Sequence, residues 1–166
     1  MQKIMFSDRF GLTGAVREGW KRQTRREEDP AAAPKYAVGE FVAIARCYRD
    51  LGWPEGFGGA GYKNKMFVRA EDMPESIRIT AVRGEMADAI SEKDALLEGI
   101  RPEGRYFTFT DSLAKTPVPL YDNPRSAFFE LFRRLTGKDP RRTRIFVRVY
   151  DFELCVNAGG GNNDHA

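Results

Sequence analysis

Residues 144–154 read RIFVRVYDFEL, and this stretch indicates how the chain folds. Ile145, Val147 and Val149 alternate with larger or charged side chains, and a period of two places successive side chains on opposite faces of a β-sheet. The β-branched and aromatic residues also favour a strand. We therefore expect a closing strand near the end of the chain.

Other stretches rich in β-branched and aromatic residues predict further strands, at residues 38–48, 65–70, 76–82 and 106–110. In the third of these, Ile77, Ile79 and Ala81 fall on one face. The predicted strands are separated by irregular, glycine- and proline-containing segments rather than by tight two-residue turns. Such spacing is typical of a small curled sheet.

Three helices are expected between these strands. In the first, Leu12, Val16 and Trp20 recur at four-residue spacing behind a cap at Ser7 or Asp8. The second is short and has three landmarks: Ser91 as its cap, Asp94 in the position of a capping-box acid and Glu98 in its last turn.

The third helix, over residues 124–135, is the clearest. It follows the cap Asn123 and carries one apolar stripe that we interpret as core rather than as a cofactor site. Together the elements predict an α+β fold, a small curled β-barrel with flanking short helices. A length of 166 residues suits one domain. We assign residues 1–156 to it and expect residues 157–166 to be a disordered polar tail.

Composition excludes several classes of chemistry. His165, in the tail, is the only histidine, which argues against a Ser-His-Asp triad, a Cys-His pair and a histidine metal site. Cys47 and Cys155 are too far apart for a zinc knuckle and are interpreted as reduced thiols. The sequence shows neither a membrane-spanning stretch nor a signal peptide. We expect a cytoplasmic protein without metal, cofactor or membrane partner.

Cations gather in two places although the net charge is only +3. Five lie within residues 17–26 and six within residues 133–144. Each cluster either meets phosphate groups or is a solvated face that nearby acids neutralise. The presence of two clusters in one small domain favours an anionic partner.

Gly56, Gly58 and Gly61 reproduce the spacing of a dinucleotide-binding loop. That site needs a strand leading into the glycines and a helix leaving them. Here Pro54 precedes the glycines and no amphipathic helix follows. We therefore interpret residues 52–61 as a flexible loop or lid.

Residues 19–26 (GWKRQTRR) resemble the G-x-K-x-x-T-x-R signature that opens ASCH domains, a PUA-like β-barrel family. Further landmarks of that family have counterparts in the same order, at residues 38–40, 77–82, 90–92 and 98–100. Residues 121–135 and 147–154 resemble the ends of its longer, phage-associated members. The resemblance covers most of the chain and implies a pocket for a nucleoside or an RNA segment.

The smallest members of that family are amidohydrolases that deacetylate N-acetylcytidine with a lysine, a threonine and a glutamate. The matching residues here are Lys21, Thr24 and Glu98. A lysine can act as the base for a threonine hydroxyl only when the pKa of the lysine is lowered. Neighbouring arginines favour a lowered pKa because like charges repel. Lys21 and Thr24 meet only if the chain turns after Gly19, since residues three apart lie on opposite faces of a strand.

Three functions remain open. The chain is either an amidohydrolase acting on a modified pyrimidine nucleoside, a non-catalytic RNA-binding module, or a phage accessory protein that binds a host protein through the glycine-rich loop. In the first two cases we expect cations to hold phosphate and aromatic rings to stack on bases. The candidate binding residues are Arg22, Arg25, Arg26, Tyr48, Trp53 and Tyr62.

Overall fold

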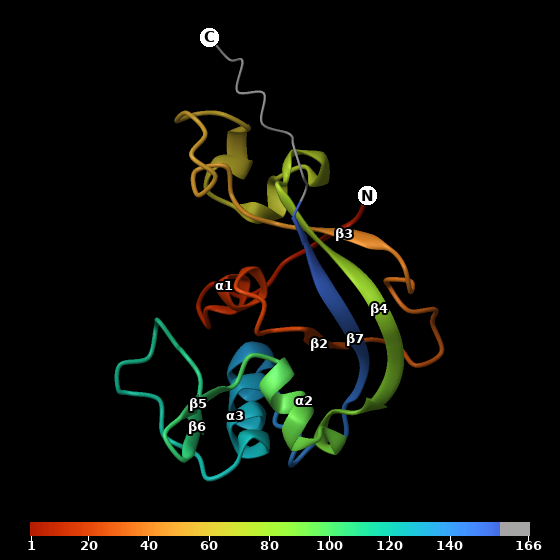
Figure 1. Cartoon of the computed structure of the whole chain (residues 1–166), viewed down its shortest axis with the longest axis vertical. Coiled ribbons are helices and arrows are strands. Elements are labelled where there is room, and N and C mark those ends of the chain that lie inside the picture. The colour runs from red at the N-terminus through yellow and green to blue at the C-terminus, as the bar shows by residue number, and fades with distance from the viewer. Residues whose placement is uncertain (157–166) are drawn as a thin grey trace.

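A mixed five-stranded sheet organises the fold (Figure 1). The structure is a computed structural model that describes residues 1–156. In the sheet, β1 and β3 run parallel and all other neighbours run antiparallel. The strands stand in the order β1 (Lys3–Ile4), β3 (Phe41–Ile44), β4 (Glu75–Met86), β7 (Phe146–Val156) and β2 (Gln23–Glu27).

The strand predicted from residues 144–154 is confirmed as β7, and it lies inside the sheet. It pairs with β4 along its whole length, from Phe146 opposite Met86 to Val156 opposite Glu75. On its other side it pairs with β2. The two longest strands, β4 and β7, thus lie side by side in the middle of the sheet, as the ribbon in Figure 1 shows.

The predicted curled barrel is wrong. A barrel closes when its two edge strands pair. Within residues 1–156, β1 and β2 stand at opposite edges of the sheet and do not pair with each other. The chain is therefore α+β with an open, mixed sheet.

Local structure explains why the sheet stays open. Residues 38–48 contribute only the four residues of β3, and β1 has only two. Residues 65–70, predicted as a strand, instead begin two 3₁₀ turns, Lys65–Phe67 and Ala70–Asp72. The Asn64 side chain caps the first turn by accepting a hydrogen bond from the Met66 amide. Too little strand remains on this side to complete a barrel.

Helix α1 (Leu12–Arg17) is shorter than predicted, and no side chain caps it. The Ser7 or Asp8 cap was wrong because Gly11 is the N-cap and Asp8 accepts a hydrogen bond from the Thr13 hydroxyl instead, at 2.6 Å. Trp20 lies beyond the end of the helix.

Helices α2 (Glu92–Leu97) and α3 (Pro124–Thr136) agree with prediction. The Ser91 side chain caps α2 and the Asn123 side chain caps α3, each by accepting a backbone N–H three residues later. Both helices lie at one end of the sheet, beside the hairpin of β5 (Arg101–Glu103) and β6 (Tyr106–Thr108) (Figure 1). The predicted strand over residues 106–110 is confirmed in part, as β6.

The core has two parts. The larger part contains the buried stripe of α3 packed with residues from α1 and the strands. A smaller cluster around Tyr48, Val68 and Met73 is formed mostly by the long connection between β3 and β4, which lies at the other end of the sheet in Figure 1. Cys47 is buried and Cys155 half-buried, and both are free thiols. Among the described residues no helix has the length and apolar character needed to cross a membrane.

Candidate active site

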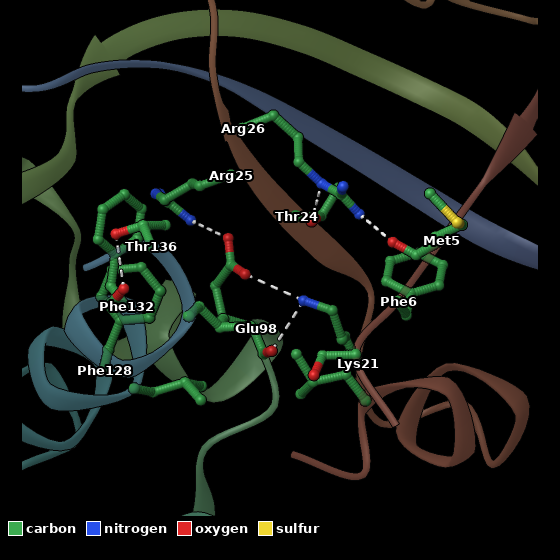
Figure 2. A pocket seen from close by; sticks show the side chains of 14 residues that line it. Met5, Phe6, Lys21, Thr24, Arg25, Arg26, Glu98, Phe128, Phe132 and Thr136 are labelled. Atoms are coloured by element: carbon green, nitrogen blue, oxygen red, sulfur yellow. Dashed lines mark hydrogen bonds and ion pairs between the residues drawn. The ribbon is translucent and has the colours of Figure 1, made fainter. Parts of the chain in front are cut away.

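A cavity of about 330 Å³ opens between β2, the end of α2, the C-terminal half of α3 and the segment that follows β1 (Figure 2). Its volume lies within the range of small-molecule sites. Residues from four separate parts of the sequence line it: Met5, Phe6, Ser7, Leu12, Lys21, Thr24, Arg25, Arg26, Glu98, Phe128, Leu131, Phe132, Leu135 and Thr136. All three predicted catalytic residues are among them.

Lys21 is almost completely buried, with 2% of its surface exposed. The chain turns at Gly19, whose φ is 84°, and brings Lys21 beside the end of α2. The ammonium group donates to three oxygens: the Gln23 carbonyl at 2.6 Å, the Glu98 carbonyl at 2.8 Å and Glu98 Oε2 at 3.0 Å. Burial lowers the pKa of Lys21, Glu98 opposes that shift, and Arg26 and Arg25 add to it.

Glu98 is the C-cap residue of α2 and is 5% exposed. Its two carboxylate oxygens have different partners, since Oε2 accepts from Lys21 and Oε1 accepts from Arg25 at 3.0 Å. The next residue, Gly99, allows the end of α2 to lie close to Leu12 and Lys21. Its φ is 115°, and a Cβ atom there would lie 2.9 Å from the Leu12 side chain. Only glycine fits both the conformation and the space.

Thr24 lies on β2 and is 4% exposed. Its Oγ1 accepts a hydrogen bond from Arg26 Nε at 3.3 Å. In Figure 2 the Thr24 side chain lies between those of Arg26 and Lys21. Within residues 1–156, the side chains of Thr24 and Lys21 share no direct hydrogen bond.

Arg26 is the partly exposed cation of the cavity. Its Nη2 donates to the Met5 carbonyl at 2.8 Å, and its guanidinium lies 5.7 Å from the centre of the Phe6 ring. Burial lowers its pKa from the ordinary value, although the group remains charged at neutral pH. Its Nη1 has no hydrogen-bond partner in the described part of the chain, so it can donate to a ligand.

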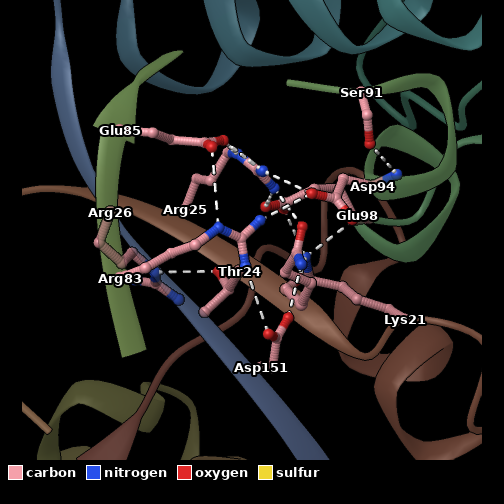
Figure 3. A network of polar contacts seen from close by, with 11 residues as sticks. Lys21, Thr24, Arg25, Arg26, Arg83, Glu85, Ser91, Asp94, Glu98 and Asp151 are labelled. Atoms are coloured by element: carbon pink, nitrogen blue, oxygen red, sulfur yellow. Dashed lines mark hydrogen bonds and ion pairs between the residues drawn. The ribbon is translucent and has the colours of Figure 1, made fainter. Parts of the chain in front are cut away.

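Arg25 was predicted to hold phosphate, but its donors are occupied within the protein (Figure 3). Nε donates to Glu85, Nη1 donates to Gln23 and Glu98, and Nη2 donates to Glu85 and Asp94. These contacts account for all five N–H groups of the guanidinium. Burial opposes its charge, but Glu98 and Glu85 prevail and raise its pKa. Arg25 therefore orients Glu98.

The network around Arg25 extends to the surface. Asp94 also accepts from Arg83 at 2.7 Å, and Arg83 reaches Asp151 at 3.3 Å. Asp151 in turn accepts from the Gln23 side chain at 2.5 Å, which returns the network to β2. Asp94 was predicted as a capping-box acid, and its carboxylate is used for these ion pairs.

The other predicted binding residues lie outside the cavity. Arg22 is exposed, and its side chain donates to the Gly19 carbonyl in a second depression beside Phe152, which shares Lys21 with the cavity. Tyr48, Trp53 and Tyr62 belong to the smaller core cluster. The Tyr48 hydroxyl donates to Asp72 at 2.6 Å. The structure thus unites the predicted catalytic residues but separates them from the predicted stacking residues.

Acids neutralise most of the two basic clusters. In the second, Arg133 and Arg134 pair with Glu130, Lys138 pairs with Glu27, and Arg141 and Arg142 pair with Asp139. In the first, Arg17, Lys21 and Arg25 have acidic partners. Three cations of these clusters have no acidic partner within 4.0 Å among the described residues: Arg22, Arg26 and Arg144. Of these three, Arg26 is the one that lines the cavity.

Sequence reasoning missed the apolar wall of the cavity and the acids behind it. The stripe of α3 was predicted as core, and Phe128, Leu131 and Phe132 are indeed buried, yet they also line the cavity. A stripe pattern does not distinguish a core contact from a cavity wall. Glu85 was missed because no local pattern relates it to Arg25, which is 60 residues away.

Titratable side chains provide no metal site in the described part of the chain. Within residues 1–156, no group of three or more His, Cys, Asp or Glu side chains is arranged to hold an ion. The acids nearest the cavity are instead engaged by Lys21, Arg25 and Arg83. The chemistry available at this cavity is that of a buried lysine, a hydroxyl, a carboxylate and a guanidinium.

Comparison with known proteins gives one distant match. No family model and no curated protein matches the chain. Among solved structures, the protein EF3133 of Enterococcus faecalis V583, from the family DUF984, is similar in part. It is 16% identical, with a TM-score of 0.44 over 93% of this chain and 76% of that protein. A likeness at this level supports no statement about function.

Proposed function

We propose that this cavity is the active site of an amidohydrolase that removes the acyl group from a modified pyrimidine nucleoside such as N-acetylcytidine. One observation carries the proposal: Lys21, Thr24 and Glu98 line the same cavity although Glu98 is 77 residues from Lys21. The resemblance to ASCH proteins implies a catalytic role for the same three residues. Their convergence supports that relationship, although the sheet is open.

The Lys21–Glu98 pair is suited to moving a proton. In the charged form, three N–H groups of Lys21 meet its three oxygen acceptors. If the proton moves to Glu98 Oε2, the carboxylic acid donates to the neutral amine along the same 3.0 Å contact. Burial lowers the pKa of Lys21, which favours release of its proton. In the proposed reaction, the Glu98 proton turns toward the substrate nitrogen, which frees the Lys21 lone pair to accept the Thr24 proton.

The proposed reaction has two steps. Thr24 Oγ1 attacks the amide carbonyl carbon while Lys21 accepts the hydroxyl proton, and Glu98 protonates the amine nitrogen as the C–N bond breaks. This releases the nucleoside and leaves an ester on Thr24. Water then hydrolyses the ester, giving the carboxylic acid and restoring the threonine hydroxyl. Arg26, beside Thr24, provides a donor for the oxyanion of both steps.

The test is a chromatographic assay of N-acetylcytidine hydrolysis by wild type and by Lys21→Met, Thr24→Val and Glu98→Gln. Loss of a general acid or base typically lowers rates by about 10²–10⁴-fold, and we expect losses of this order for Lys21→Met and Glu98→Gln. Thr24→Val removes the nucleophile and should lower the rate at least as much. Matched controls are Lys93→Met, Thr80→Val and Glu92→Gln, which replace exposed residues outside the cavity and should leave the rate unchanged.

The pH dependence provides an independent check. Because the folded-state pKa of Lys21 is lowered, the rate of a lysine-dependent step should rise with pH through a value below 10.5. Turnover that survives Lys21→Met or Thr24→Val refutes the mechanism. Binding of the nucleoside by wild type without any turnover would instead favour a non-catalytic binding module.

A further inference from the structure

The wall of the cavity is divided by polarity. Five apolar side chains, none more than 6% exposed, form its buried part, which we call the apolar floor: Phe6, Leu12, Phe128, Leu131 and Phe132. Five partly or fully exposed residues form the rim: Met5, Ser7, Arg26, Leu135 and Thr136. Lys21, Thr24 and Glu98 are buried, so the reacting group must enter past the rim.

We propose that the site selects amides with a bulky apolar acyl group, such as a chain of four to six carbons or an aromatic ring, rather than acetyl. The acyl group lies on the apolar floor, and the polar nucleoside extends to the rim. This inference rests on the proposed function for the position of the reacting carbonyl, which is set by Thr24.

Hydrogen bonding decides which half of the substrate faces inward. Ribose hydroxyls placed against the floor would lose water without gaining partners, which costs free energy. Thr136, the hydroxyl nearest to the floor along α3, already donates to the Phe132 carbonyl at 2.8 Å. At the rim, Ser7 Oγ and Arg26 Nη1 have no hydrogen-bond partner within residues 1–156. Ser7 is suited to a ribose oxygen, and the two N–H groups of Nη1 are suited to the oxyanion and to a ribose or phosphate oxygen.

Size leads to the same conclusion. An acetyl group adds one methyl beyond the carbonyl carbon, which covers little of a floor built from three phenylalanines and two leucines. Longer acyl groups remove more of this surface from water. Phe128 and Phe132, whose ring centres are 5.8 Å apart, project from α3 across the cavity from Lys21 (Figure 2). They also offer edge and face contacts to an aromatic acyl group.

Binding tests the floor independently of catalysis. N4-alkylcytidines carry no amide and are not hydrolysed, so methyl, butyl, hexyl and benzyl derivatives can be titrated into the wild-type protein by calorimetry. Each methylene that enters the floor should tighten binding roughly fourfold, corresponding to about 0.8 kcal/mol of apolar burial. Affinity that stays flat or falls from methyl to hexyl overturns the inference.

A floor variant adds a second arm. Leu131→Phe adds volume to the floor and should abolish the gain from butyl to hexyl while the methyl compound still binds. Leu113→Phe, the same substitution at an exposed position outside the cavity, is the matched control and should show the wild-type series. The wild-type series remains decisive if Leu131→Phe does not fold.

Hydrolysis of the matching acylcytidines separates the two proposals. We expect kcat/KM to be higher for butyryl, hexanoyl or benzoyl than for acetyl. If none is hydrolysed but alkyl affinity rises with size, the proposed amidohydrolase function fails and the apolar selectivity stands. If acetyl is hydrolysed fastest and the alkyl series is flat, the function stands and this inference fails.

Discussion

Arg25 should contribute much more to stability than Arg83, although the two arginines share two acidic partners. The Arg25 side chain is 0% exposed and contacts the carboxylates of Glu85, Asp94 and Glu98. Replacing it with methionine keeps most of the volume but leaves these acids with less positive charge. Removing one partner of a buried pair costs about 3–5 kcal/mol. At about 2–4 °C per kcal/mol for a domain of this size, the melting temperature should fall by roughly 6–20 °C.

The control is Arg83→Met. Arg83 pairs with the same Glu85 and Asp94 and also with Asp151, but its side chain is 41% exposed. Exposed pairs contribute about 0–1 kcal/mol. Urea unfolding followed by circular dichroism gives both free energies. If Arg25→Met costs no more than Arg83→Met, the reasoning that burial makes Arg25 a structural organiser of the site is refuted.

Two further predictions concern regions away from the cavity. The side chain of Asp111 is 1% exposed; hydrogen bonding from Arg9 lowers its pKa to about 2, with Arg134 also contributing. A lowered folded-state pKa gives stability that is present above about pH 4 and lost as pH falls toward 2. Asp111→Asn should remove this part of the acid dependence of the urea midpoint, whereas the exposed Asp122→Asn should not; equal curves for wild type and Asp111→Asn contradict the prediction. In the glycine-rich loop, Gly58→Ala should lower the free energy of unfolding by about 2–5 kcal/mol. The φ of Gly58 is 72°, which strains any other residue, and the new Cβ would lie 2.4 Å from the Tyr48 ring. Gly59→Ala has a φ of 56° and open space, so it should cost only about 1–2 kcal/mol, and equal costs in urea unfolding would show that the Tyr48 contact is unimportant.

The basic and aromatic residues illustrate how composition alone misleads about binding. Eleven cations in two short segments predicted an anionic partner, yet most of them are paired with acids in the described structure. Tyr48 and Trp53 were predicted to stack on bases, but they pack on each other with ring centres 5.4 Å apart. Arg26 is the cation that retains a donor facing the cavity.

The sequence by itself determined those features that depend on interactions between residues close together in the chain. The Ser91 and Asn123 caps, the apolar stripe of α3 and the alternation in β7 each involve residues a few positions apart, and all appear as predicted. The trio Lys21, Thr24 and Glu98 was also named from sequence, through resemblance and residue chemistry.

Tertiary structure decided what depends on distant partners. Whether the sheet closes depends on which strands meet, and here β1 and β2 remain at opposite edges. Whether Arg25 binds a ligand or a carboxylate depends on Glu85 and Glu98, which lie 60 and 73 residues away. The ion-pair partners and the burial of a side chain depend on its three-dimensional surroundings. Arg25 is therefore a buried structural cation, whereas its neighbour Arg26 lies at the rim of the cavity.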